Sequence, residues 1–220
     1  MDIKEGYLCE VSWEVCNKVG GINTVIVSKA PYIKSKVSNY LLIGPYFPNN
    51  PSRDFIEEIV PSEFKDAFSE MKAQGIPCRY GKWFIKSEPN VILIDFAHLF
   101  EKKNEIKKLL WEWYGVDSLQ AGFDFDEPVV YSVAAAKLID LLQRKTGKKI
   151  IAQFHEWMTG AGLLWLKKFN NGVSSIFTTH ATVLGRATVG NNPMFYTQLE
   201  SYDTEKEAHE HGVVAKHHME

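Results

Sequence analysis

Segments typical of strands and segments typical of helices alternate along almost all of the 220 residues. Strands are expected where short runs are rich in β-branched and aromatic residues, and helices where apolar residues recur every three or four positions. The strands are expected over residues 7–15, 40–44, 78–86, 91–96, 150–154 and 174–179, and the helices over residues 22–31, 61–74, 99–114, 128–147, 162–169 and from 193 onward. This alternation predicts an α/β fold with a mainly parallel sheet and helices on both faces.

Charge and composition exclude several classes of partner. The formal net charge is -2, so nothing attracts the chain as a whole to nucleic acid or to anionic lipid. No apolar run reaches the roughly 18–20 residues that a membrane-spanning helix needs, so no membrane partner is expected. Cys9, Cys16 and Cys78 form no C-x-x-C pair and are odd in number. The cysteines therefore argue against a disulfide framework and favour a cytoplasmic location.

The loop expected after the first strand, Asn17-Lys18-Val19-Gly20-Gly21, is the first candidate for chemistry. In open parallel sheets, ligands bind beyond the carboxyl ends of the strands. Gly20 and Gly21 allow close approach to the backbone, and the free amides of a helix start, together with Lys18, favour an anion such as phosphate. A tight turn with an exposed lysine is the alternative. The loop matches neither G-x-G-x-x-G nor G-x-x-x-x-G-K, so a dinucleotide oxidoreductase is disfavoured and no cofactor is expected.

The second candidate is Phe154-His155-Glu156-Trp157, at the end of the strand expected over residues 150–154. His155 has the position to bond a substrate hydroxyl or to donate to developing negative charge. Glu156 could accept sugar hydroxyls, and Trp157 could present an apolar face to a sugar. The alternative is a histidine with a structural role only. Because position 159 is threonine, the H-E-x-x-H zinc pattern fails, and no metal is expected.

The third candidate lies at the end of the strand expected over residues 174–179. Thr178-Thr179-His180-Ala181-Thr182 and then Leu184-Gly185-Arg186 place hydroxyls, a histidine and an arginine at the same edge of the sheet. These side chains could line a carbohydrate pocket, but the hydroxyls could equally cap the following turn. Since no G-x-S-x-G elbow is present and no cysteine has a nucleophile context, hydrolase chemistry has little support.

Longer blocks that contain these candidates resemble the glycogen synthases of the eukaryotic type, glycosyltransferase family three. The resemblance is carried, in order along the chain, by residues 13–22 (WEVCNKVGGI), 43–46 (IGPY), 80–85 (YGKWFI), 154–157 (FHEW), 176–186 (IFTTHATVLGR) and 203–208 (DTEKEA). It implies two Rossmann-like lobes that face a cleft, the GT-B fold. Residues 1–220 would form most of the N-terminal, acceptor-side lobe, and the nucleotide-sugar lobe would lie outside them.

The resemblance also implies an activity and residue roles. Such enzymes transfer glucose from a nucleotide sugar to the 4-hydroxyl at the non-reducing end of an α-1,4-glucan such as glycogen, with retention at the anomeric carbon. UDP-glucose is favoured over ADP-glucose as the donor. Lys18, Gly20 and Gly21 fall on the loop near the donor phosphates, and His155 falls on the catalytic histidine that contacts the transferred glucose. The residues expected to bind sugar or acceptor are Asn17, Glu156, Trp157, Thr179, His180 and Arg186.

Three segments depart from the family pattern. Cys16 replaces a usual alanine, Met158-Thr159-Gly160 replaces a run ending Ala-Gly, and Ala187 replaces a usual aromatic residue. These departures leave the class unchanged and bear on acceptor contacts. The resemblance places the phosphate-binding arginine and lysine, the active-site glutamate and the nucleoside pocket in the second lobe, outside residues 1–220. We therefore expect residues 1–220 to be inactive alone. A non-catalytic glucan-binding or regulatory module, a two-lobed transferase with another acceptor, and homo-oligomer formation by the full-length protein all stay open.

Overall fold

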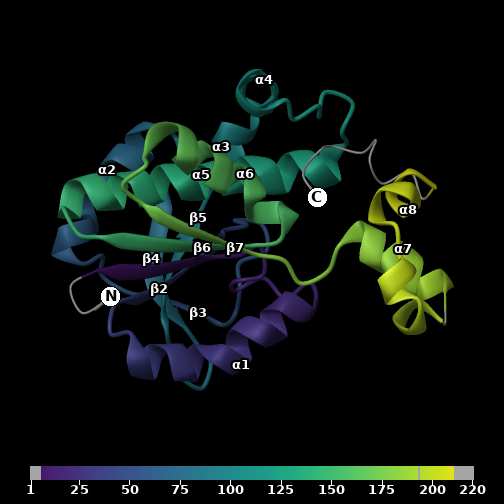
Figure 1. Cartoon of the computed structure of the whole chain (residues 1–220). Coiled ribbons are helices and arrows are strands. Elements are labelled where there is room, and N and C mark those ends of the chain that lie inside the picture. Colours follow the sequence, from purple (N-terminus) through teal and green to yellow (C-terminus); the bar gives the residue numbers. More distant parts are fainter. Residues whose placement is uncertain (1–5, 193, 211–220) are drawn as a thin grey trace.

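The structure, a computed structural model, describes residues 6–192 and 194–210, and its centre is a seven-stranded sheet (Figure 1). The strand order is β3-β4-β5-β2-β1-β6-β7. The strands are β1 (Tyr7–Val11), β2 (Tyr40–Pro45), β3 (Phe55–Glu57), β4 (Cys78–Trp83), β5 (Asn90–Ile94), β6 (Ile150–His155) and β7 (Ser174–Thr178). The helices are α1 (Gly21–Lys36), α2 (Lys65–Ala73), α3 (Ala97–Phe100), α4 (Lys103–Tyr114), α5 (Phe123–Thr146), α6 (Trp157–Phe169), α7 (Val183–Asn191) and α8 (Thr204–Glu210), with 3₁₀ turns η2 (Ser62–Phe64), η3 (Phe195–Thr197) and η4 (Leu199–Ser201).

Most of the sheet is parallel. β5, β2, β1, β6 and β7 run in one direction, whereas β4 pairs antiparallel with β5, and β3 pairs antiparallel with β4. The predicted α/β, Rossmann-like fold with a mainly parallel sheet is therefore confirmed. The strand β3 was not predicted, because three residues are too few to show an alternating pattern.

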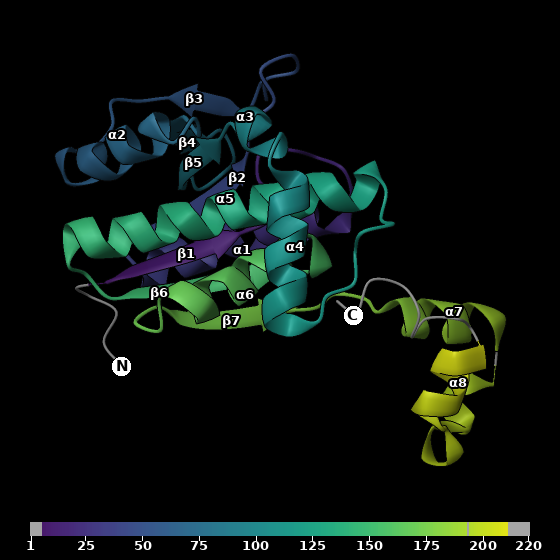
Figure 2. The same ribbon diagram turned by 90° about the horizontal axis from the view of Figure 1, so that it is seen from above.

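Helices cover both faces of the sheet (Figures 1 and 2). α1 covers one face, where Ile26 and Ala30 belong to the same buried cluster as Leu42 of β2. α2, α5 and α6 cover the other face, where Leu41 and Ile43 of β2 join a second, larger cluster. Successive residues of β2 thus point into two different cores, which explains why this strand is apolar throughout.

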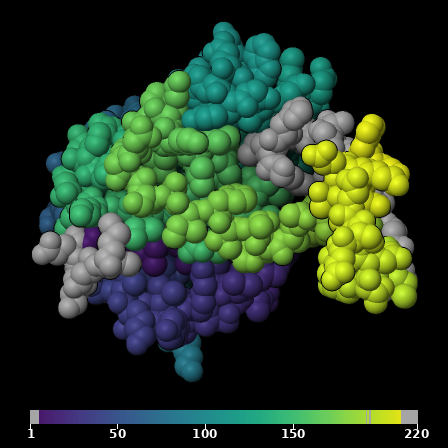
Figure 3. Space-filling model, viewed as in Figure 1, coloured from purple at the N-terminus to yellow at the C-terminus, as the bar shows by residue number. Residues whose placement is uncertain are grey.

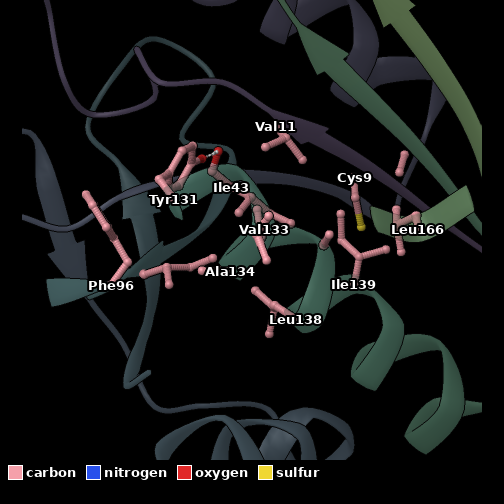
Figure 4. Packing of buried hydrophobic residues seen from close by; sticks show 14 of the residues in the cluster. Cys9, Val11, Ile43, Phe96, Tyr131, Val133, Ala134, Leu138, Ile139 and Leu166 are labelled. Carbon is pink, nitrogen blue, oxygen red and sulfur yellow. Dashed lines mark hydrogen bonds between the residues drawn. The ribbon is translucent and has the colours of Figure 1, made fainter. Parts of the chain in front are cut away.

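α5 is the centre of the larger core. Figure 4 shows Val133, Ala134 and Leu138 of this helix among the strand residues, with Tyr131 directed at β2. The Tyr131 hydroxyl donates to the carbonyl of Ile43 at 2.8 Å, so this buried polar group has a partner. The buried stripe of α5 extends over most of its length, and this burial stabilises the longest helix of the structure.

The first strand and the turn after it differ from prediction. β1 ends at Val11 rather than at residue 15. The following residues turn instead, with the N–H of Val15 donating to the Ser12 carbonyl at 3.3 Å and Cys16 at a φ of 54°. β2 passes so close to this turn that a Cβ on Gly44 would lie 2.5 Å from the carbonyl oxygen of Val15. The turn and Gly44 therefore form one packed unit at the end of the parallel strands.

Several predicted helix boundaries were wrong, and two of the errors involve proline. α1 continues through Pro31 to Lys36, and α5 begins at Phe123, so that Pro128 lies inside the helix instead of at its start. A proline removes one helical hydrogen bond. Burial offsets that loss on both sides of Pro128 in α5, and through Ile26 and Ala30 of the preceding turns in α1. α6 also begins earlier than predicted, at Trp157. Residues 99–114 form parts of two helices, α3 and α4, instead of one.

The segment after β7 forms an arm that projects from one end of the sheet (Figures 1, 2 and 3). It contains α7, the turns η3 and η4, and α8. The helix α7 was not predicted, and the helix expected from residue 193 begins only at Thr204. Residue 193 and residues 211–220, over which that expectation extended, lie outside the described residues. Over the part that is described, no helix is long and apolar enough to cross a membrane.

Candidate functional site

The loop that follows β1 is held in place by the buried carboxylate of Glu14. Its Oε2 accepts the backbone N–H of Gly20 at 2.8 Å and that of Asn23 at 2.9 Å. The Asn23 side chain in turn donates to the Glu14 carbonyl at 2.9 Å. Because Gly20 is the N-cap of α1, the carboxylate lies at the positive end of the helix dipole. The chain therefore supplies its own anion to this helix start.

This capping limits where an external anion could bind. Glu14 already occupies the N–H groups of Gly20 and Asn23, so a phosphate would use the amides between them. A Cβ on Gly20 would lie 3.0 Å from Glu14 Oε1, whereas a Cβ on Gly21 would meet nothing within 4 Å. Lys18 is exposed in the same loop. The loop is thus a tight turn that leaves its backbone open at Gly21.

His155 ends β6 and is completely buried. Its Nε2 lies 2.7 Å from Oε1 of Glu10, and its Nδ1 lies 2.8 Å from Nε2 of His180. The two imidazole rings stack, with centroids 5.1 Å apart and planes inclined by 17°. Since both ring nitrogens of His155 have partners, a sugar hydroxyl could reach Nδ1 only by replacing His180, which is exposed.

Glu10 of β1 is the carboxylate on which this group of side chains converges. Besides His155, it accepts Nζ of Lys29 from α1 at 2.7 Å and the hydroxyl of Tyr40 from β2. Burial by itself would raise the pKa of Glu10, but the hydrogen bond from His155 and the charge of Lys29 lower it below its ordinary value of 4.5. Glu10 is therefore ionised at neutral pH although its side chain is only 1% exposed.

Glu156 fixes the connection from β7 to α7. Its Oε1 accepts the backbone N–H of His180 and, at 2.9 Å, that of Ala181. The φ of Glu156 is 62°, in the left-handed region that few non-glycine residues adopt. Partial burial lowers the pKa of His180, and so does the neighbouring His155, while the charge of Glu156 raises it. The net effect favours a neutral His180 at neutral pH.

The other residues expected to bind sugar come from several different elements. Trp157 is half-buried and stacks on Phe125 of α5, with ring planes inclined by 6°. Thr179 is exposed at the end of β7, and Arg186 is exposed on α7 in the arm. The hydroxyl of Thr182 caps α7 by accepting a backbone N–H at 2.9 Å. For Thr182, the capping alternative is confirmed.

Asn17 lines a cleft of about 610 Å³ at the carboxyl ends of β1, β2 and β5. Trp13 and Phe47 contribute aromatic walls, and Glu127 of α5 lies at the rim. Burial, with a contribution from the charge of Asp124, raises the pKa of Glu127. Apolar walls with a few polar groups are typical of a site for a small organic ligand such as a sugar.

Thiol and metal chemistry have little basis in the described residues. The three cysteines are free, and burial raises the pKa of the Cys9 thiol to about 12. A thiol with that pKa stays protonated at neutral pH and is a poor nucleophile. No group of three or more histidine, cysteine, aspartate or glutamate side chains in residues 6–192 and 194–210 could hold a metal ion.

Glu10, Glu14, Lys29 and Tyr40 were not among the residues singled out from the sequence. The signal for Glu10 was present, since it is a carboxylate in a strand whose other residues are apolar or aromatic. Such a residue in a central parallel strand must find partners, because an unpaired buried charge is costly. Nothing in the sequence indicated that these partners would be His155, Lys29 and Tyr40.

Comparison with known proteins relates nearly the whole chain to one family. Residues 10–220 match a family model described as glycogen synthase. The chain is 36% identical over 224 residues to the liver glycogen [starch] synthase of Mus musculus, 36% identical over 223 residues to glycogen [starch] synthase of Dictyostelium discoideum, and 33% identical over 233 residues to glycogen [starch] synthase isoform 2 of Saccharomyces cerevisiae. These matches cover 100%, 97% and 100% of this chain, but 32%, 24% and 33% of the relatives. The chain thus spans about a third or less of the length of the curated relatives it matches.

Proposed function

Because the chain belongs to the glycogen synthase family, we propose that the protein it forms part of is a retaining glucosyltransferase of the cytosol. It transfers glucose from a nucleotide sugar, with UDP-glucose the favoured donor, to the 4-hydroxyl at the non-reducing end of an α-1,4-glucan such as glycogen. Residues 1–220 form its N-terminal, acceptor-side lobe. Homo-oligomer formation by the full-length protein stays a prediction.

One observation carries this proposal. β1 and β6 are neighbouring parallel strands, with Val11 opposite Phe154, so the loop of Lys18 and the side chain of His155 lie at the same edge of the sheet. A helix start with backbone amides left open at Gly21, next to a histidine, suits a nucleotide sugar, in which a phosphate is bonded directly to the sugar. In a retaining transfer, negative charge builds on the leaving phosphate, so a cation and oriented amides at that place lower the barrier.

The proposed roles follow this geometry. Lys18 and the open backbone at Gly21 bind the donor phosphates, with Gly20 and Glu14 setting the shape of the loop. His155 contacts the transferred glucose. Glu156, Trp157, Thr179, His180 and Arg186, together with Asn17 in the cleft beside β1, contribute to binding sugar or acceptor.

Because the chain spans about a third or less of its relatives, we expect that it does not transfer glucose by itself. The test is glucose transfer to glycogen by the full-length protein, supplied separately with UDP-glucose and ADP-glucose. Replacing Lys18 by alanine should reduce kcat/KM by about 10²–10³, the usual effect of removing one group that stabilises transition-state charge. Lys36→Ala, at the far end of α1 and also exposed, is the matched control and should leave kcat/KM unchanged.

The rival is a non-catalytic glucan-binding module. It predicts that the folded full-length protein sediments with glycogen and transfers no glucose from either donor, and that glycogen binding survives both Lys18→Ala and His155→Ala. Glucose transfer by the wild-type protein that is lost in His155→Ala would exclude this rival, and the nucleotide sugar that supports the transfer would be identified as the donor.

A further inference from the structure

The buried carboxylate of Glu10 receives donors from three other elements. Lys29 comes from α1, Tyr40 from β2 and His155 from β6. Lys29 is 26% exposed and can reach water, whereas His155 is fully buried. An ionised carboxylate accepts hydrogen bonds and cannot donate them. The proton between Glu10 and His155 must therefore belong to Nε2 of His155.

This proton decides the state of the other ring nitrogen. A neutral imidazole with a proton on Nε2 has a lone pair on Nδ1. Nδ1 of His155 lies 2.8 Å from Nε2 of His180, so in this neutral form of His155 it is His180 that donates its Nε2–H. The hydrogen bonds of this form run in one direction, from His180 to His155 and from His155 to Glu10.

We propose that Glu10 is a positioning residue for His155. Its carboxylate accepts the hydrogen bond from Nε2–H and fixes the ring. Nδ1 is then left free to accept a hydrogen bond from a hydroxyl at the carboxyl edge of the sheet. In the ligand-free chain His180 supplies that donor, and a hydroxyl of the transferred sugar would replace it. The proton on Nε2 follows from the three donors that meet the Glu10 carboxylate, whereas the sugar hydroxyl rests on the proposed function.

The surroundings of the pair favour this one arrangement. The charged and titratable groups near the two rings are Glu10, Lys29, Tyr40, Glu14 and Glu156. Of these, Glu10 is the one in contact with the His155 ring, and it meets Nε2. The backbone of His155 is also held, because its carbonyl accepts the hydroxyl of Thr159 at 2.7 Å. With the backbone and Nε2 both fixed, the ring has little freedom to turn Nδ1 away from the edge.

The first test is NMR of the 220-residue chain with ¹⁵N-labelled histidine at pH 7.5. The His155 signals are assigned by their loss in His155→Gln. We expect the wild-type His155 proton on Nε2, strongly shifted downfield by the carboxylate, and an unprotonated Nδ1. A proton on Nδ1, or on both nitrogens, would overturn the proposal without any variant.

Three substitutions separate positioning from simple packing. Glu10→Leu removes the acceptor, so the downfield Nε2–H signal should be lost. Glu10→Gln should keep that signal with a smaller shift, because Lys29 selects the amide oxygen at the place where Oε1 now lies. Tyr40→Phe removes a different donor to Glu10 and should retain the signal. A folded Glu10→Leu chain with an unchanged downfield signal would contradict the role given to Glu10.

The full-length protein tests the link to catalysis. There, Glu10→Leu should lower kcat for glucose transfer more than tenfold, and Glu10→Gln should restore at least part of this loss. Equal losses in both variants would reduce Glu10 to a structural role. If the wild-type full-length protein transfers no glucose, the proposed function fails, while the NMR result still decides the proton position.

Discussion

Acid lowers the stability that His180 and Glu10 each contribute to the fold, but it does so in different pH ranges. Loss of water contact and the nearby His155 lower the pKa of His180 below its ordinary value of 6.5, so the unfolded chain binds this proton more readily than the folded one. Stability from His180 is therefore complete above pH 6.5 and falls as the pH decreases below it. The lowered pKa of Glu10 acts only below its ordinary value of 4.5, where its ion pairs begin to be lost.

We therefore expect the Tm of the chain to fall between pH 7.5 and pH 5.5, and to fall less steeply in His180→Gln. Glutamine can still donate to Nδ1 of His155 but does not titrate. Thermal unfolding followed by circular dichroism across this range measures both slopes. His98→Gln is the control, since His98 is an exposed histidine whose ring lies 3.5 Å from Glu101. A slope unchanged in His180→Gln, or flattened equally in His98→Gln, would contradict this prediction.

At the scale of single residues, the sequence indicated which residues lie at the binding edge of the sheet, but not which residues contact one another. His155 and His180 were singled out because both lie at the ends of expected strands, and the structure brings them within hydrogen-bond distance. Lys18, Gly20 and Gly21 could likewise be assigned to a loop at a helix start. The roles of Glu10 and Glu14 could not, because both depend on partners that are 6 to 145 residues away in the chain.

At the scale of elements, α5 and α6 pack at unusually short range. A Cβ on Gly162 of α6 would lie 2.4 Å from the carbonyl oxygen of Ser132 on α5, and the Ser132 hydroxyl accepts the Gly162 N–H at 2.5 Å. That hydroxyl also donates to the carbonyl of Thr159 at 2.6 Å. Because backbone atoms cannot move aside as a flexible side chain can, the two helices would have to separate to admit a methyl group.

Gly162→Ala should therefore destabilise the chain by about 1–3 kcal/mol, the typical cost of overpacking a core. Gly190→Ala is the matched control, because it also lies in a helix, α7, and its Cβ would meet nothing within 4 Å. There the higher helix propensity of alanine should leave stability unchanged or raise it by up to about 1 kcal/mol. Urea unfolding of the two variants measures the difference. Equal free energies of unfolding would show that the α5–α6 contact relaxes without cost.

Three strands were placed within one residue of their observed ends. β2 and β6 are largely buried on both faces and are recognisable as short apolar runs, and β7, although exposed, contains the β-branched and aromatic residues typical of a strand. The starts of α5 and α6 were misplaced by five residues each, since Pro128 and the glycines of α6 are weak helix signals that tertiary packing overrides. Local propensity could not reveal that Gly162 is required by the carbonyl of Ser132.

At the scale of the whole molecule, the sheet with its two helical layers and the arm after β7 are different kinds of structure. The layered part contains both buried clusters. In the arm, α7 packs on α8, and apolar side chains such as Val183, Tyr196 and Leu199 remain exposed within the described residues. Figures 1 and 2 show the arm projecting beyond the end of the sheet. The arm therefore contributes little to the core that holds the layers together.

A chain that ends at Thr182 should accordingly keep the fold of the sheet and its two layers. It retains β7 and the backbone N–H groups of His180 and Ala181 that bind Glu156. Its Tm should lie within about 3 °C of that of the 220-residue chain, a shift that corresponds to about 1 kcal/mol in a protein of this size.

A chain that ends at Gly172 is the control. It lacks β7 and His180, which exposes the edge of β6, and its Tm should be lower by a clearly larger amount. Loss of cooperative unfolding in the Thr182 chain would mean that the arm packs on the sheet layers in solution instead of projecting from them.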